Sequence, residues 1–133
     1  MKCLDTNIMI DFLRGKIEAL KKMKELENEP LSTTTINIFE LLYGAKVSVR
    51  REDNVKEVKR FISNLEIFSF DERAAEECSN ILEYLKKSGK MIGIRDLLIG
   101  GICISNNLEL ITNNIKHFAN IKKLKVEGYL GEI

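Results

Sequence analysis

The chain has 133 residues, the length of one compact domain, so no second domain is expected. Apolar residues make up 44% of it and charged residues 31%, with a single proline, which excludes a low-complexity chain and favours a soluble, helix-rich one. The formal charge of +1 excludes a strong overall attraction to nucleic acid or to an anionic membrane. Any such contact must therefore come from a local patch.

In chain order, a strand at residues 2–6 is followed by a helix start at 7–15 and a charged amphipathic helix at 16–29. A threonine-rich second strand, 31–36, leads to helices at 37–47 and 51–65. A third strand, 66–70, leads to a long helix at 71–89, with Asp71 as its N-cap. A helix at 94–106, a strand at 108–112, a helical turn at 115–118 and a candidate fifth strand at 124–129 complete the chain.

This alternation of strands and helices predicts an α/β fold, a three-layer sandwich with a central parallel sheet of four or five strands flanked by helices. We expect one domain, residues 1–133. Ligands of such sheets bind at the carboxyl ends of the strands, near the point where strand order reverses. Asp5 ends the first strand and residues 112–114 end the fourth, so both motifs are predicted on the same rim.

Cysteine and histidine usage narrows the class of site. Cys3, Cys78 and Cys103 are far apart in apolar surroundings, which indicates buried thiols in a reducing compartment, and the cytoplasm is expected. No signal-peptide pattern opens the chain and no apolar run is long enough for a membrane helix. With His117 as the only histidine, a zinc site built from Cys and His is not expected.

Three acids do not fit the solvated helix faces that account for most of the others. Asp5 interrupts a strand-like apolar run, Glu40 shares a helical face with Ile36, and Asp96 lies in the least polar helix of the chain. Burying an ionised carboxylate costs several kcal/mol unless a cation or good donors offset it. Arg95 is expected on a different face from Asp96, so a divalent metal is the simpler explanation. Oxygen ligands without His or Cys favour Mg²⁺ or Mn²⁺.

The stretch ITNN supplies further candidates. Thr112, Asn113 and Asn114 are expected at the strand end opposite Asp5, where an Asn amide can bind a metal weakly or anchor its water, although Asn pairs at strand ends are commonly turn formers. Thr6 and Asn7 could cap the first helix, orient the neighbouring carboxylate, or do both.

In four stretches, LDTNIMIDFLRG, FELLYGA, GIRDLLIGG and LELITNNIKHF, the chain resembles the PIN-domain ribonucleases, and within them the VapC-type toxins of prokaryotic toxin–antitoxin pairs. The resemblance implies that Asp5, Glu40 and Asp96 bind the metal and that Asn114 stands where the family has a fourth Asp or Asn. Gly100 and Gly101 replace a common Ala-Ala pair, which casts doubt on the local rigidity of that helix.

The resemblance also implies an activity and partners. The activity is endonucleolysis of RNA with Mg²⁺ or Mn²⁺, and the partner is a VapB-type antitoxin that binds DNA. A homodimer is expected, and with antitoxin a heterotetramer or larger assembly. Metal-activated water would attack in line and leave 5′-phosphate and 3′-hydroxyl ends. Lys116, Lys122 and Lys123 follow the last motif and are candidates for RNA contact, or for a merely solvated face.

Other functions stay open at this point. A PIN-domain nuclease could process RNA without an antitoxin, or bind RNA without cutting it. A receiver-like Mg²⁺-binding signalling module would need paired early acids and a Lys after its last strand, where this chain has Asp5 alone and ITNN. An aspartate-nucleophile phosphatase would need an acid at the position of Asn7.

Overall fold

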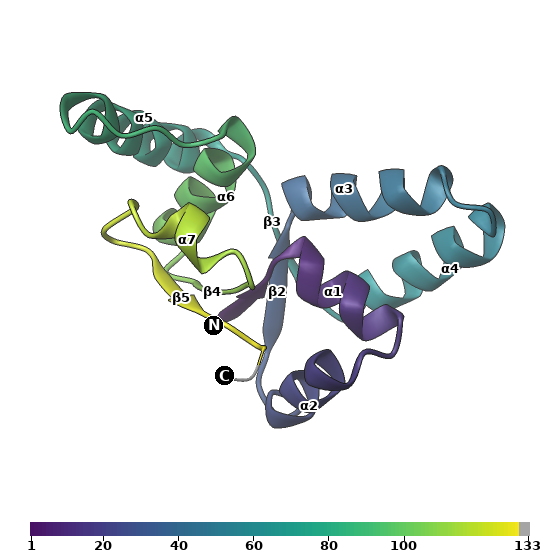
Figure 1. The fold of residues 1–133 in the computed structure, drawn as a ribbon. Coiled ribbons are helices and arrows are strands. Elements are labelled where there is room, and N and C mark those ends of the chain that lie inside the picture. Colours follow the sequence, from purple (N-terminus) through teal and green to yellow (C-terminus); the bar gives the residue numbers. More distant parts are fainter. Residues whose placement is uncertain (131–133) are drawn as a thin grey trace.

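The computed structural model describes residues 1–130 and shows a five-stranded sheet with helices on both faces (Figure 1). The strands are β1 (Lys2–Leu4), β2 (Leu31–Thr34), β3 (Glu66–Phe68), β4 (Glu109–Ile111) and β5 (Lys125–Glu127). The helices are α1 (Thr6–Leu13), α2 (Ile17–Glu25), α3 (Thr35–Lys46), α4 (Arg51–Ile62), α5 (Glu72–Lys87), α6 (Ile94–Ser105) and α7 (Ile115–Phe118). Within the described residues no helix is both long and apolar enough to cross a membrane.

The predicted α/β sandwich is confirmed. The strand order is β3-β2-β1-β4-β5 and every neighbouring pair is parallel. The order reverses between β1 and β4, where the chain leaves the first strand in one direction and later returns on its other side. The single-domain prediction stays a prediction, and residues 131–133 of its range lie outside the described part of the chain.

Two apolar cores hold the layers together. Helices α5 and α6 cover one face of the sheet, where Cys3 and Leu110 meet Ile99, and α1 to α4 cover the other, where Leu4 and Ile111 are buried (Figure 1). Because the central strands are covered on both faces, their residues are buried without alternation, as expected of a parallel sheet, and in β2 these buried residues include Ser32, Thr33 and Thr34. The three cysteines are buried free thiols, as predicted.

Several element boundaries differ from the predicted ones. β1 ends at Leu4, and Asp5 is the N-cap of α1 instead of a strand residue. β2 ends at Thr34, which caps α3 with its hydroxyl, so the helix begins at Thr35, two residues before its predicted start. Threonine runs favour strands, but a Thr hydroxyl that accepts the Asn37 N–H, as here, also starts a helix. Asp71 caps α5 as predicted.

Gly101 lies where α5 and α6 come closest. A Cβ at this position would lie 2.2 Å from the Cys78 Sγ and 3.0 Å from the Ala74 carbonyl oxygen, so glycine permits this close approach of the two helices. At Gly100 the nearest atom is the end of the Ile121 side chain, at 2.8 Å. Gly101, one of the two glycines that cast doubt on the rigidity of α6, therefore allows this helix to pack closely against α5.

Candidate active site

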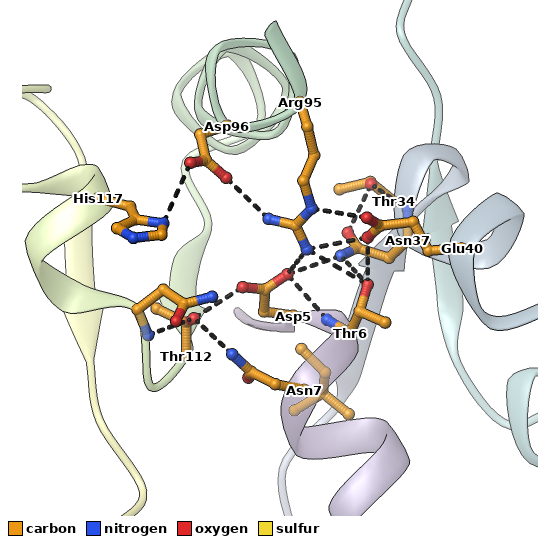
Figure 2. Close-up of polar contacts among 12 residues, drawn as sticks. Asp5, Thr6, Asn7, Thr34, Asn37, Glu40, Arg95, Asp96, Thr112 and His117 are labelled. Carbon is orange, nitrogen blue, oxygen red and sulfur yellow. Dashed lines mark hydrogen bonds and ion pairs between the residues drawn. The ribbon is translucent and has the colours of Figure 1, made fainter. Parts of the chain in front are cut away.

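The candidate site lies at the carboxyl ends of β1, β2 and β4, at the reversal of strand order. Asp5 follows β1, Thr112 follows β4, and Glu40 stands on α3, the helix that follows β2. The first turn of α6 brings Arg95 and Asp96 over the same rim (Figure 2). Sequence positions more than 100 residues apart therefore meet in one place, as the parallel topology predicts.

Asp5 is at the centre of the cluster and is fully buried. Its Oδ1 accepts hydrogen bonds from the Thr6 backbone N–H at 2.8 Å and from Asn37 Nδ2 at 2.9 Å, and its Oδ2 accepts one from Thr112 Oγ1 at 2.7 Å. The carboxylate therefore caps α1 and also presents charge to the rim, so both roles considered for it apply. Its orientation is fixed by donors from three separate elements.

Arg95 joins the three acids. Its Nε donates to Glu40 Oε2 at 2.7 Å and its Nη2 to Glu40 Oε1 at 2.9 Å, which is the paired, planar contact typical of arginine and carboxylate. Nη2 also donates to Asp5 Oδ1 at 2.7 Å, and Nη1 donates to Asp96 Oδ1 at 2.8 Å (Figure 2). One guanidinium thus contacts all three carboxylates.

The expectation that Arg95 would face away from Asp96 is wrong. Successive helix positions do diverge at Cβ, but Arg95 is in the first turn of α6, and its long side chain curls back across the turn. Burial lowers the pKa of Arg95, yet the hydrogen bonds with Glu40 and the charge of Asp5 outweigh it and raise that pKa above its ordinary value. The guanidinium is therefore permanently charged, and it offsets one of three negative charges.

Asn37 is a site residue that sequence reasoning missed. Its side chain is fully buried and donates from Nδ2 to both Asp5 Oδ1 and Thr6 Oγ1, each at 2.9 Å. Thr34 Oγ1 donates to its Oδ1 at 2.6 Å, which fixes the orientation of the amide. The signal was present in the spacing, because Asn37 precedes Glu40 by three positions and shares its helix face.

Within the ITNN stretch, Thr112 supports Asp5, whereas Asn114 lines a cleft beside it. Thr112 Oγ1 donates to Asp5 and accepts from the Asn114 backbone N–H at 3.1 Å and from Asn7 Nδ2 at 3.4 Å. Thr6 Oγ1 donates to Glu40 Oε1 at 2.6 Å. Thr6, Asn7 and Asn114 line an open cleft of about 570 Å³ together with Glu40 and Asp96, whereas Asn113 and the fully buried Asp5 are not among its lining residues.

The candidate basic residues are not gathered around this cleft. Lys122 and Lys123 line a different pocket against α5, where the Lys122 Nζ lies 4.6 Å from the centre of the Tyr84 ring. Lys116 is exposed on α7, beside His117. His117 does line the cleft, with its Nδ1 3.6 Å from Asp96 Oδ2 and its side chain largely exposed.

The donor chemistry of the cleft fits a hard divalent cation. The carboxylates of Asp5, Glu40 and Asp96 already surround a cation, the Arg95 guanidinium. They offer a metal ion only oxygen atoms as ligands. Asn7 Oδ1 is a buried oxygen with no hydrogen-bond partner among the described residues, beside the same acids. While Arg95 lies between these acids, no three Asp, Glu, His or Cys side chains within residues 1–130 are close enough together to bind one metal ion.

Comparison with known proteins agrees with this geometry. The PIN domain family profile matches residues 2–124. The tRNA(fMet)-specific endonuclease VapC of Salmonella typhimurium is 32% identical over 126 residues, 95% of this chain and 96% of the relative. DNA-bound VapBC from Salmonella typhimurium has a TM-score of 0.86 at 30% identity, covering 98% of this chain and 99% of that one. VapBC2 from Rickettsia felis, bound to a promoter DNA fragment, has a TM-score of 0.87 at 30% identity, covering 97% of this chain and 98% of that one.

The chain belongs to the PIN-domain family, among the VapC ribonucleases. The resemblance inferred from the four sequence stretches is thereby confirmed. The match spans the acids after β1, on α3 and on α6, so it includes every carboxylate of the cluster.

Proposed function

We propose that this chain is a metal-dependent endoribonuclease and the toxin of a toxin–antitoxin pair. The observation that carries the proposal is the meeting of three carboxylates at the edge of the sheet where ligands of this fold class bind: Asp5 directly after β1, Glu40 on α3 and Asp96 on α6. Stability alone does not require such a cluster, because one guanidinium offsets only one of its three negative charges. A site for an external cation accounts for it.

Asp5, Glu40 and Asp96 would hold the ion, and Asn114, which lines the cleft with Glu40 and Asp96, is a fourth candidate. VapC nucleases of the PIN family depend in general on a metal ion, and oxygen donors favour Mg²⁺ or Mn²⁺ here. A bound divalent ion would supply polarisation of the scissile phosphate and activation of water.

The protein's own residues prepare the cleft for this chemistry. Thr112 and Asn37 hold the Asp5 carboxylate from opposite sides, so that it does not rotate when a phosphate approaches. Thr6 donates to Glu40, which fixes the second acid relative to the first. His117 lies at the exposed rim beside Asp96, where it would contact the RNA backbone as it enters. Water would attack the phosphorus and the P–O3′ bond would break, with the 3′-oxygen leaving and taking up a proton, so that the products carry 5′-phosphate and 3′-hydroxyl ends.

The partner is a VapB-type antitoxin, with which the chain forms a heterotetramer or larger assembly built on a homodimer. The similar VapBC structures from Salmonella and Rickettsia support this assignment. The substrate is RNA, and the named target of the Salmonella relative makes tRNA a first candidate.

The test uses the purified chain and end-labelled RNA. We expect cleavage with added Mg²⁺ or Mn²⁺, none in EDTA, and none with Asp96→Asn while its circular dichroism spectrum stays that of the wild type. The products should be ligatable 5′-phosphate ends. Cleavage that persists in EDTA, or 2′,3′-cyclic phosphate ends, would overturn the proposed mechanism.

A further inference from the structure

The ligand oxygens of the proposed metal site are already engaged by a residue of the chain. Arg95 donates to both oxygens of Glu40, to Oδ1 of Asp5 and to Oδ1 of Asp96. Outside its reach are Oδ2 of Asp5, which accepts from Thr112, and Oδ2 of Asp96, which faces His117. A metal ion therefore cannot use all three acids while the guanidinium keeps these contacts.

We propose that Arg95 is an intramolecular competitor of the metal ion: its guanidinium holds the carboxylates together in the metal-free protein and leaves them when a divalent cation binds, so that Arg95 sets the metal affinity of the site. This inference rests on the proposed metal-dependent function. It adds a determinant of metal affinity that the ligand set alone does not contain.

The charges in the cleft make the exchange favourable. Three carboxylates hold one guanidinium, so exchange of this singly charged group for a doubly charged ion lowers the unbalanced negative charge from two to one. If the guanidinium kept its place, it would repel the incoming ion at short range in a partly buried site. Metal binding and the Arg95 contacts are thus coupled, and the coupling acts equally on both.

The structure also indicates which partner moves. Asp5 is fully buried and is held by Thr112, Asn37 and the Thr6 N–H, so its carboxylate has no freedom to turn away. The Arg95 side chain is 31% exposed and stands in the first turn of α6, next to the exposed Gly93 and Ile94 that line the open cleft. Movement of the arginine toward solvent would break its hydrogen bonds to the three acids, which the bound ion would replace.

The alternative is that Arg95 is a structural clamp that stays in place when the ion binds. Under that alternative, removal of the arginine would loosen the carboxylates and weaken metal binding. The two possibilities therefore predict changes of opposite sign in one measured quantity.

The experiment is a Mn²⁺ titration of the protein without RNA. Binding is measured by calorimetry and by the electron paramagnetic resonance signal of free Mn²⁺. Arg95→Gln should bind Mn²⁺ about tenfold or more tightly than the wild type, within the usual range of coupling between two sites. Arg95→Lys keeps the charge and should bind close to the wild type. Asp5→Asn, which removes a ligand, should lose binding and shows that the titrated site is this one.

A second measurement needs no substitution in the protein studied. The Nε–H of Arg95, identified in the nitrogen–proton spectrum by its absence in Arg95→Lys, should shift and exchange faster with water when Mg²⁺ is added to the wild type. This result would support the inference even if Arg95→Gln folded poorly. An unchanged signal at saturating Mg²⁺ would overturn it.

The outcomes separate the inference from the proposed function. Equal or weaker binding by Arg95→Gln, with binding abolished in Asp5→Asn, overturns the role of Arg95 and leaves the metal site standing. Absence of Mn²⁺ binding in both the wild type and Arg95→Gln overturns the metal site, and the inference with it.

Discussion

Two ionic clusters lie on this sheet, and their charge balance differs. Over β1, β4 and β5, Lys2 donates to Glu109 at 2.8 Å and to Glu127 at 2.9 Å, and Lys22 of α2 also bonds Glu127. Two ammonium groups thus meet the two partly buried carboxylates of Glu109 and Glu127, and Lys22 also pairs with a third, that of Glu25, which is largely exposed to solvent. At the carboxyl ends of the strands, three carboxylates share the single guanidinium of Arg95.

The difference separates a cluster that stabilises the fold from one that requires something further. The lysine–glutamate cluster is complete in itself: hydrogen bonds from Lys22 and Lys2 lower the pKa of Glu127 to about 2, which means that folding favours the charged form. The carboxylate–arginine cluster, which consists of Asp5, Glu40 and Asp96 around Arg95, carries surplus negative charge at the proposed site of cleavage. Surplus charge of this kind is typical of sites that trade stability for function.

The largest expected effect concerns Asp5→Asn compared with Glu127→Gln in RNA cleavage. Loss of an outer partner of a metal ligand typically costs about 10- to 100-fold, so loss of the Asp5 charge should cost more than about 100-fold. Glu127→Gln should cleave at the wild-type rate, because its side chain contacts Lys2 and Lys22 and not the cleft. Initial rates on one RNA at saturating Mg²⁺ provide the measurement. Equal losses in the two variants would mean that both clusters act only through the fold.

The same two substitutions should rank in the opposite order in their effect on the free energy of unfolding. Glu127→Gln removes the negative charge that pairs with two lysines and one of the two acceptor oxygens, and at pH 7 we expect it to lower the free energy of unfolding by about 1 kcal/mol, after allowance for screening of this partly exposed group. Asp5→Asn relieves repulsion among three acids and should leave the midpoint of urea unfolding unchanged or raised. Glu83→Gln, in an exposed pair with Lys87, is the matched control and should change little.

The stability difference between the wild type and Glu127→Gln should depend on pH, in a direction set by the pKa of Glu127. The pKa of Glu127 is lower in the folded chain than its ordinary 4.5, so its contribution is present above about pH 4.5 and is lost as the pH falls toward 2. Urea titrations of the wild type and Glu127→Gln should therefore converge between pH 5 and pH 2. A gap that stayed constant over that interval would show that the glutamate acts by packing and not by charge.

The sequence was sufficient for the features that depend on pattern. Alternating strands and helices predicted the parallel sheet, and the unusual surroundings of Asp5 and Asp96 predicted their meeting at one rim. Element boundaries were less accurate, because Thr34 has a hydroxyl that starts a helix and a β-branched carbon that favours a strand.

The features that the sequence did not predict depend on side-chain reach and on distance in space. Periodicity describes the direction of Cβ, so it placed Arg95 on the wrong face, while the guanidinium lies several bonds further on. Lys122 was grouped with the cleft by sequence proximity, yet it packs over Tyr84. Gly101 was expected to loosen its helix because its contact, Cys78, is far away in the chain.

A smaller effect is expected at Thr112, which belongs to the carboxylate–arginine cluster but has no charge. Thr112→Val keeps the volume and removes the hydroxyl that donates to Asp5, and we expect about a tenfold slower cleavage. Thr112→Ser keeps the hydroxyl and should stay near the wild-type rate. If valine and serine were equally active, the hydrogen bond would not position the acid, and charge alone would account for the sensitivity of the cluster.

Salt should produce the smallest effect. The screening length falls to about 3 Å at 1 M ionic strength, so pairs near the surface weaken while well-covered ones do not. The Lys22 side chain is 11% exposed and Glu127 35%, which places their pair between these limits. The stability difference between wild type and Glu127→Gln should therefore shrink by only a few tenths of a kcal/mol between 0.05 and 1 M NaCl. Complete loss of the difference in 1 M NaCl would mean that the lysine–glutamate cluster is an ordinary surface network, and that only the carboxylate–arginine cluster is shielded from solvent.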